Sequence, residues 1–185
     1  MSARRVWIIV CALALAVGLA ACGQVSDPVS SENDGVYVDA GPITYQLQVS
    51  RQLNQYTTED SQYLSGLPEG QGTLTPSQLW YGVFLWAKNQ TNEAHVTADR
   101  FTIVDTTGDV YHPIPLNAEL NGYAWTAQTL EPSGIEPAPS TTAANGPTQG
   151  GLILFKLPTA VYSDRPRTLN IYPPTGHPAT ISLDL

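Results

Sequence analysis

The alternation of apolar and polar residues along the chain predicts a series of short β-strands. Residues 43–49 read Ile-Thr-Tyr-Gln-Leu-Gln-Val, and this period of two is typical of a half-buried strand. Further apolar stretches that predict strands occupy residues 79–89, 101–105, 110–112, 123–130, 151–157, 168–172 and 179–183. Seven or eight short strands separated by turns favour an antiparallel β-sandwich.

Local turn and helix patterns complete this expectation. Residues 106–109 place Gly108 between two of the strands, and a glycine that accepts a positive φ predicts a hairpin there. One helix is predicted over Thr58 to Leu64, because acidic residues begin it and Gly66 follows it. The expected fold class is therefore all-β, an immunoglobulin-like antiparallel sandwich with at most one short helix.

The strand over residues 79–87 is apolar on both faces, whereas a sandwich strand needs only one buried face. Leu79, Tyr81, Val83, Leu85 and Ala87 share one face. One interpretation is that residues 51–67, or the long loop described next, cover the other face as a second core layer. This is favoured because large aromatic side chains are usually buried. The alternative is an exposed partner-binding patch made of Trp80, Phe84, Trp86, Tyr123 and Trp125.

The segment from Glu131 to Gly150 is dominated by Pro, Ser, Thr, Ala and Gly. Twenty residues of this composition are uncommon inside a compact domain. A mobile surface loop without a specific role is favoured over a functional loop, because such residues bury little apolar surface.

The first residues are typical of an export signal. Arg4 and Arg5 precede an apolar run from Val6 to Ala21, which is shorter than the roughly 20 residues of a membrane-spanning helix. The run ends in Leu-Ala-Ala-Cys-Gly at positions 19–23, which resembles the bacterial lipoprotein signal. The resemblance implies cleavage before Cys22, diacylation of its thiol and acylation of the new amino terminus. The alternatives are an uncleaved anchor and simple secretion with a free Cys22.

This signal divides the chain of 185 residues into three parts. Residues 1–21 are predicted to be the lipoprotein signal peptide, residues 22–38 a lipidated flexible tether, and residues 39–185 one sandwich domain. Two acyl chains would anchor the protein stably at the extracytoplasmic face of the cell membrane. With Cys22 acylated and Cys11 removed, no intramolecular disulfide is expected.

Charge excludes one class of partner. The chain has 8 Lys and Arg against 16 Asp and Glu, a net charge of −8, so nucleic-acid binding is not expected. An acidic domain is also repelled by anionic lipid headgroups. The membrane partner is therefore the lipid anchor, and a further partner would be an envelope or membrane protein.

No catalytic, metal or cofactor site is assigned. His95, His112 and His177 lack metal-ligand spacing, and no zinc, phosphate-loop, dinucleotide or serine-nucleophile motif occurs. Asp99, Asp105 and Asp109 cluster near the predicted hairpin. Because Ca²⁺ takes six to eight oxygens, we favour the interpretation that these residues bond the backbone at a turn.

Several degenerate patterns together resemble a family of secreted lipoproteins, common in actinobacteria, that carry one immunoglobulin-like domain of unknown function. They are Trp86–Thr91, Phe101–Asp105 with Gly108 and Tyr111, Leu130–Pro132, Gly151–Pro158 and Leu169–Ile171. The resemblance implies the fold and supplies no catalytic residues. Ser133 departs from the pattern, which has a glycine after Pro132. Asn89-Gln90-Thr91 also matches a glycosylation acceptor. We interpret this match as a coincidence, because polar residues of this kind commonly end a strand.

The functional expectation is a lipid-anchored, extracytoplasmic binding or accessory module of the cell envelope, without enzymatic activity and acting through protein–protein interaction. One alternative is a substrate-capturing lipoprotein that serves a transporter, which needs a closed apolar pocket. The other is an envelope hydrolase, which needs one of the histidines beside a serine or a carboxylate.

Overall fold

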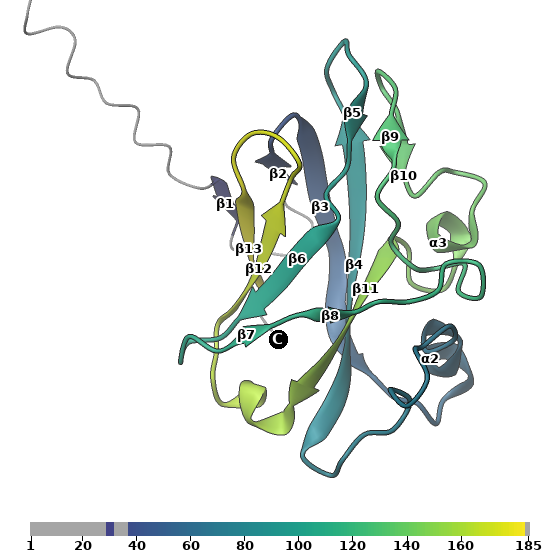
Figure 1. Ribbon diagram of the computed structural model, residues 1–185, viewed down its shortest axis with the longest axis vertical. Coiled ribbons are helices and arrows are strands. Elements are labelled where there is room, and N and C mark those ends of the chain that lie inside the picture. Colours follow the sequence, from purple (N-terminus) through teal and green to yellow (C-terminus); the bar gives the residue numbers. More distant parts are fainter. Residues whose placement is uncertain (1–28, 32–36, 184–185) are drawn as a thin grey trace, which may run out of the picture.

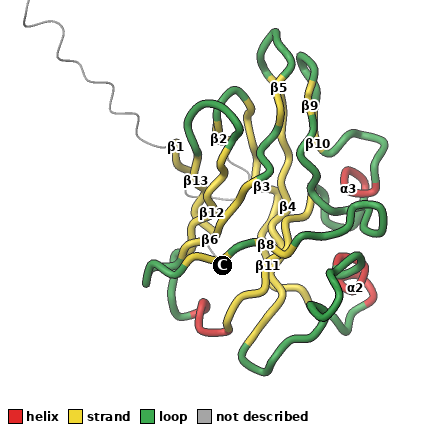
Figure 2. Tube along the Cα trace, viewed as in Figure 1, coloured by secondary structure: helices red, strands yellow, loops and turns green. Residues whose placement is uncertain are grey.

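The computed structural model describes residues 29–31 and 37–183. Two β-sheets pack face to face, and a short two-stranded ribbon extends from one end of the sandwich (Figure 1). Strands make up most of the regular structure, and the helices are short (Figure 2). The predicted all-β sandwich is confirmed.

The first sheet has five strands, and all its pairings are antiparallel except the one between β1 and β13. In spatial order the strands are β1 (Val29–Ser31), β13 (Ala179–Leu183), β12 (Arg167–Tyr172), β6 (Arg100–Val104) and β7 (Val110–Tyr111). The hairpin predicted around Gly108 is the β6–β7 pair, and Gly108 has a φ of 90°.

The second sheet has six strands arranged around the long central strand β4. In spatial order they are β2 (Tyr37–Ala40), β3 (Ile43–Leu53), β4 (Gln78–Asn89), β11 (Gly151–Pro158) and β8 (Pro113–Ile114), while β10 (Ile135–Glu136) also pairs with β4. The ribbon is formed by β5 (His95–Val96) and β9 (Thr129–Leu130).

Alternating side chains of both sheets fill the space between them. In β12 and β13 every second residue is buried, as the period of two predicts. We call this cluster the inter-sheet core; its largest members include Tyr45, Leu47, Tyr81, Leu85, Phe101, Ile103, Phe155, Leu157, Leu169, Ile171 and Ile181.

A second apolar cluster lies on the opposite face of the β4 sheet. Seven consecutive residues of β4, from Leu79 to Leu85, are buried, so the strand is covered on both faces. We call this second cluster the outer cluster; it comprises Leu53, Tyr63, Trp80, Phe84, Tyr123, Ala143, Leu152 and Leu154, with partly buried Val49, Leu64, Leu67, Leu74, Ile114 and Leu116 packed against it.

The predicted helix is confirmed as α2 (Thr58–Tyr63). The hydroxyl oxygen of Thr57 accepts a hydrogen bond from the Asp60 amide at 3.2 Å and so caps the helix. Gly66 follows with a φ of 70°. The structure adds a second short helix, α3 (Thr142–Asn145), and a 3-10 turn, η1 (Thr159–Tyr162), neither of which was predicted.

Two expectations about segment boundaries are wrong. The tether predicted over residues 22–38 contains β1, which pairs with β13, and the first two residues of β2, which pair with β3. Part of that segment therefore belongs to the sandwich, because its backbone completes sheet edges. The strand predicted over residues 123–130 is reduced to β9 and an isolated parallel bridge between Ala124 and Leu152.

The Glu131–Gly150 segment is also more buried than its composition predicts. Ala143 and Ala144 of α3 are buried, and so is Glu136 of β10. Thr141 caps α3 through its hydroxyl oxygen. Small side chains allow this segment to approach the sheet closely, and it covers part of the outer cluster.

Candidate functional site

Three of the five residues proposed as a partner-binding patch belong to the outer cluster. Trp80 and Phe84 are 0% exposed, and Tyr123 is 7% exposed. The patch interpretation is therefore wrong for these three residues, and the second-core interpretation is confirmed. Covering these rings removes large apolar areas from water, which stabilises the fold.

Both segments expected to cover this face contribute to the cover. Tyr63 of α2 contacts the rings of Phe84 and Tyr123 edge-on, with centroid distances of 5.1 and 4.7 Å. The Tyr123 hydroxyl donates a hydrogen bond to Gln62 Oε1 at 2.7 Å. From the long loop, Ala143 packs against the same cluster.

An ion pair holds α2 against strand β3. Arg51 donates to Asp60 Oδ1 at 2.6 Å, and the Asn54 amide donates to Asp60 Oδ2 at 2.7 Å. Burial raises the pKa of Asp60, but these hydrogen bonds and the Arg51 charge outweigh burial and leave that pKa below its usual value. The pair therefore stabilises the position of the helix.

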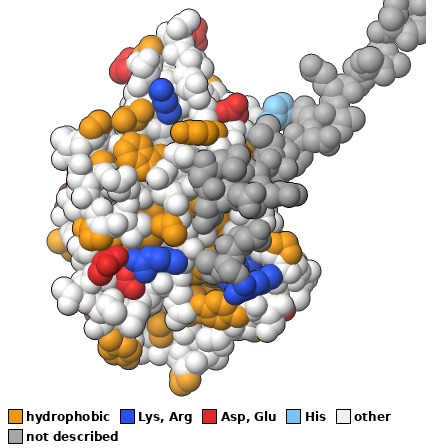
Figure 3. All heavy atoms as spheres, turned by 180° about the vertical axis from the view of Figure 1, so that it is seen from behind, with side chains coloured by type: hydrophobic (Ala, Val, Ile, Leu, Met, Phe, Trp, Pro, Cys, Tyr) orange, Lys and Arg blue, Asp and Glu red, His pale blue; other side chains and the backbone are white. Residues whose placement is uncertain are grey.

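The two remaining aromatic residues of the proposed patch do not lie together. Trp86 is half-buried and belongs to the outer face of β4, whereas Trp125 packs against the inter-sheet core. On the described surface seen from behind, hydrophobic side chains form several separate groups (Figure 3). The five residues therefore do not form one patch.

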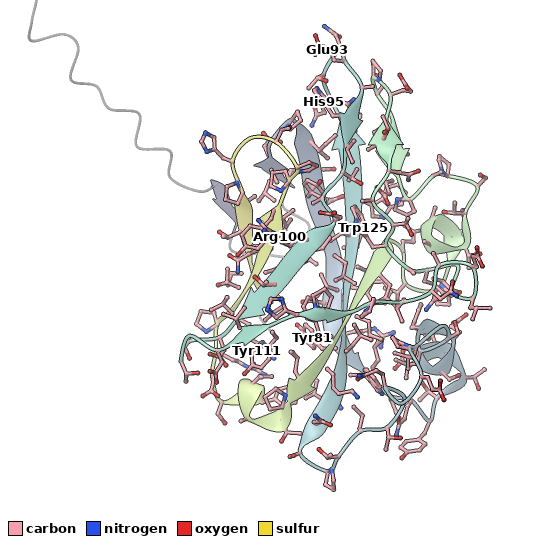
Figure 4. The ribbon with its side chains drawn as sticks, in the orientation of Figure 1. Tyr81, Glu93, His95, Arg100, Tyr111 and Trp125 are labelled. Carbon is pink, nitrogen blue, oxygen red and sulfur yellow. The ribbon has the colours of Figure 1, made fainter. Side chains whose placement is uncertain are left out.

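Trp125 lies between the two sheets, close to β6 (Figure 4). Its ring contacts Phe101 at 5.8 Å and Tyr45 at 6.1 Å between centroids. Its indole nitrogen donates to the Ala98 carbonyl at 2.8 Å. The Trp125 amide donates to the Leu152 carbonyl at 2.9 Å, so the ring is fixed from both its side chain and its backbone.

Beside this ring is a groove of about 250 Å³, which we call the Trp125 groove. Its one charged lining residue is Asp99, which is exposed. Its wall includes a proline-rich stretch that leads out of β8, the edge strand of the second sheet. The full lining is Asp99, Phe101, Pro113, Ile114, Pro115, Leu116, Trp125, Leu152, Ile153 and Leu154.

Asp105 and Asp109 lie at the turn of the β6–β7 hairpin, as the favoured interpretation predicted, whereas Asp99 precedes the opposite end of β6 and lines the Trp125 groove. Asp105 Oδ1 accepts hydrogen bonds from the Thr107 and Asp109 amides at 2.9 and 3.0 Å, and Oδ2 accepts one from the Tyr111 hydroxyl at 2.8 Å. Burial raises the pKa of Asp105, but these bonds leave it below its usual value. The described residues contain no group of three or more His, Cys, Asp or Glu that could hold a metal ion.

Two of the three histidines line one depression. His95 and His177 share it with Asp39, and its volume is about 360 Å³, while His112 lies between β7 and β8. The Asp39 carboxylate accepts a hydrogen bond from Thr44 Oγ1 at 2.6 Å instead of from an imidazole. The depression thus brings two imidazoles near a carboxylate whose described hydrogen bond comes from a hydroxyl.

A second pocket, of about 160 Å³, lies where β10 meets residues 122–128. We call it the Glu136 pocket. Glu136 is 4% exposed, and its Oε2 has no hydrogen-bond partner within the described part of the chain. Burial raises the pKa of Glu136 from 4.5 to about 7, although hydrogen bonds from Thr97, Gln128 and the Thr126 backbone oppose the shift.

Three buried polar residues were not predicted from the sequence pattern. Asn89 is 0% exposed, and its side-chain nitrogen Nδ2 donates to the backbone carbonyls of Glu93, Leu130 and Glu131. The Asn-Gln-Thr triplet is thus a structural junction. Arg167 is fully buried, with its guanidinium 5.1 Å from the Tyr81 ring centre. The strand predicted over residues 168–172 began one residue after Arg167, which is the first residue of β12, and nothing in the pattern around Glu136 indicated burial.

The lipidation site predicted at Cys22 lies outside the described residues. Among the helices that the structure describes, none is long and apolar enough to span a bilayer.

Comparisons with known proteins extend the description of the fold. No protein-family model matches the sequence. No curated protein is significantly similar to it. Among solved structures, the chain is similar to the YjhA protein of Bacillus subtilis, with a TM-score of 0.55 and 12% identity over 83% of this chain and 99% of that one.

Two further solved structures are more distant. One is a candidate lipoprotein, YcdA, from Bacillus subtilis, with a TM-score of 0.49 and 12% identity over 83% of this chain and 39% of that one. The other is an uncharacterized β-sandwich protein from Clostridium difficile, with a TM-score of 0.44 and 11% identity over 87% and 99% of the two chains. At these identities the likeness to YjhA concerns the fold alone.

Proposed function

We propose that the protein is a lipid-anchored, non-enzymatic binding module of the cell envelope that holds a membrane or envelope protein at the Trp125 groove. Cys22 carries the anchor, and the sandwich presents the groove on the extracytoplasmic side. The actinobacterial, immunoglobulin-like family assignment belongs to the same proposal. The observation that carries it is the groove itself, a concave surface whose lining residues are apolar except for Asp99 and of which six lie on β6, β8 and β11.

The size and charge of the Trp125 groove favour a protein segment as its occupant. Its volume of about 250 Å³ is below the roughly 300–1,000 Å³ typical of small-molecule pockets, so we prefer this function to substrate capture. An apolar side chain fits against Trp125 and Ile114. A neighbouring Lys or Arg of the partner would meet Asp99, the one charge in the lining.

The groove is tested by photo-crosslinking in native membranes. A crosslinking amino acid at the exposed, groove-lining position 115 should capture one discrete partner, whereas the same group at position 56, which is 88% exposed, should not. The Asp99→Lys variant should abolish the product, and Glu119→Lys, another exposed acidic site, should retain it. Equal capture at both positions, or capture that survives Asp99→Lys, would overturn the assignment.

The anchor is tested separately with Cys22→Ala. The variant should appear as an unprocessed precursor or be released from membranes, because acyl chains supply the stable attachment. Normal processing together with unchanged membrane retention would contradict the lipid anchor.

A further inference from the structure

An open depression lies where the end of β3 leads toward α2 (Figure 1). Its volume of about 410 Å³ falls within the roughly 300–1,000 Å³ typical of small-molecule sites. We call it the Tyr56 site, and its lining residues are Gln52, Leu53, Asn54, Gln55, Tyr56 and Leu74. None of them lines the Trp125 groove, so the two sites are separate.

The polar and aromatic side chains of the Tyr56 site are open to solvent. Tyr56 is 88% exposed, more than any other large hydrophobic side chain in the described part of the chain. Gln52 and Asn54 are exposed as well, and Gln55 is half-buried. A ligand can therefore reach both the aromatic ring and the amides, and covering the ring would remove apolar surface from water.

Hydrogen bonds within the protein fix the orientation of all three side-chain amides. The Tyr56 amide donates to Asn54 Oδ1 at 3.0 Å, and the indole nitrogen of Trp80 donates to Gln55 Oε1 at 3.3 Å. Gln52 Oε1 accepts a hydrogen bond from the hydroxyl of the tyrosine in η1. Backbone and indole N–H groups can only donate, so the amide oxygens are the atoms that face them.

The three amide nitrogens are left as the free ends of these side chains. Within the residues that the structure describes, Nε2 of Gln52, Nδ2 of Asn54 and Nε2 of Gln55 donate to no protein acceptor. Each NH2 group offers two N–H donors. Because the amide oxygens are already held, these donors are ordered before a ligand arrives, which lowers the entropic cost of binding.

We propose that the Tyr56 site binds a neutral saccharide chain. One sugar ring stacks its C–H face on the Tyr56 ring, whose face carries partial negative charge. The oxygens of the sugar, either hydroxyl oxygens or the carbonyl oxygen of an acetamido group, accept hydrogen bonds from the three amides. The half-buried Leu74 supplies apolar contact beside them.

The chemistry of the lining favours a neutral saccharide over ions and proteins. No charged side chain lines the site. Arg51 donates to the Gln52 carbonyl at 3.4 Å, but Glu59 and Asp60 pair with its guanidinium, so this charge does not serve an anion. The six lining residues are also far fewer than the roughly 20–30 residues on each side of a stable protein interface.

A saccharide at this site is consistent with position 56 as the control for protein capture. A crosslinker placed there would meet sugar and would give no discrete protein product. Loss of the Trp125 groove should also leave the Tyr56 site intact, because the two linings share no residue. Asp99→Lys should therefore bind saccharide as the parent protein does.

The experiment titrates the full-length protein, in a zwitterionic detergent without a sugar headgroup, with two tetrasaccharides. One is β-1,4-linked N-acetylglucosamine, and the other is β-1,4-linked glucose. NMR follows the amides of residues 54–56 and the indole N–H of Trp80, which reports on Gln55 through their hydrogen bond. We expect these resonances to shift saturably, and the tighter tetrasaccharide identifies whether an acetamido carbonyl contributes.

Variants of exposed residues test the two kinds of contact. Tyr56→Ala should weaken binding at least about tenfold, as expected for an aromatic anchor, whereas Tyr56→Phe keeps the ring and should bind nearly as the parent does. Gln52→Leu should weaken binding about fivefold, because it removes one donor. Tyr37→Ala is the matched control, since Tyr37 is 65% exposed and pairs with the opposite end of β3.

Denaturant unfolding should show that Tyr56→Ala is as stable as the parent, because the side chain is exposed. A decaproline peptide serves as the competing class of ligand and should give no saturable shift. The proposal is overturned if neither tetrasaccharide binds, if Tyr56→Ala and Tyr37→Ala bind equally well, or if the peptide shifts the same resonances at lower concentration than both sugars.

Discussion

The inter-sheet core and the outer cluster lie on opposite faces of the same strand, β4, but they are built differently. The inter-sheet core joins two sheets whose strands are held in register by backbone ladders. The outer cluster packs one sheet face against α2, α3 and irregular segments. Both contain fully buried aromatic rings, so burial alone does not distinguish them.

The difference concerns what happens when each region opens. Separating the two sheets exposes most of the apolar residues of the fold at once. Displacing α2 breaks a six-residue helix, its cap and the Arg51–Asp60 pair, while the ladders of β4 remain. We therefore expect the outer cluster to open locally, at a lower free energy than global unfolding.

The largest expected effect comes from truncating a ring in the inter-sheet core. Phe155→Ala on β11 should lower the free energy of unfolding by about 4 kcal/mol, because a cavity between two rigid sheets cannot collapse. Phe84→Ala on β4 removes an equally buried ring from the outer cluster. Its cost should be about 3 kcal/mol, since irregular segments can close around the cavity.

Denaturant unfolding of the two variants measures this difference directly. Both variants should unfold in a single transition, and the slope of the free energy of unfolding against denaturant concentration should not change. A cost for Phe84→Ala that equals or exceeds the cost for Phe155→Ala would show that the cover of the outer face is as rigid as the opposite sheet.

The sequence predicted the sheets better than the site, for physical reasons that particular residues illustrate. The period of two placed Leu169, Ile171 and Ile181 in the core because alternation and burial are directly linked in a strand. The two apolar faces of β4 correctly indicated a second core. Trp125 could not be assigned to a groove, because its neighbours come from distant segments.

Burial of the long loop escaped prediction for a related reason. Composition indicates how much apolar surface a segment can bury by itself, and the side chains of Glu131–Gly150 carry little apolar surface. Its close approach depends on the facing surface, where Tyr63 and Phe84 offer an apolar base. Glu136 is buried for a different reason, because β10 pairs with β4 and places Glu136 opposite Ala87 of the inter-sheet core; no local pattern indicated this pairing.

The second expected effect is a dependence of the free energy of unfolding on pH. The pKa of Glu136 is about 7 in the folded protein, against 4.5 in a free side chain. Between these values the folded state keeps a proton that the unfolded state has lost. The free energy of unfolding therefore falls as the pH rises through this range, by about 3 kcal/mol in total.

Glu136→Gln should remove this fall and so be more stable than the parent at pH 8 and similar to it at pH 4.5. Asp60 and Asp105 have lowered pKa values, and the stability they contribute is lost only as the pH falls toward and below their usual values. Thermal unfolding from pH 4.5 to 8, with Glu131→Gln as the control, measures the slope. A parent protein with flat stability across this range would refute the raised pKa.

The smallest expected effect concerns the cap of α2, and it separates the two apolar regions most clearly. Thr57→Ala removes the acceptor for the Asp60 amide and should cost about 1 kcal/mol. If the outer cluster opens locally, hydrogen exchange should accelerate about fivefold at the α2 amides, and in parent and variant alike these amides should open at a lower free energy than the amides of β12 and β13, which exchange through global unfolding. Thr141→Ala, which removes the equivalent cap of α3, is the matched control for the other cover segment. Equal free energies of opening for the α2 amides and for the amides of β12 and β13 would instead mean that α2 and the sandwich unfold as one cooperative unit, and the distinction between the two regions would fail.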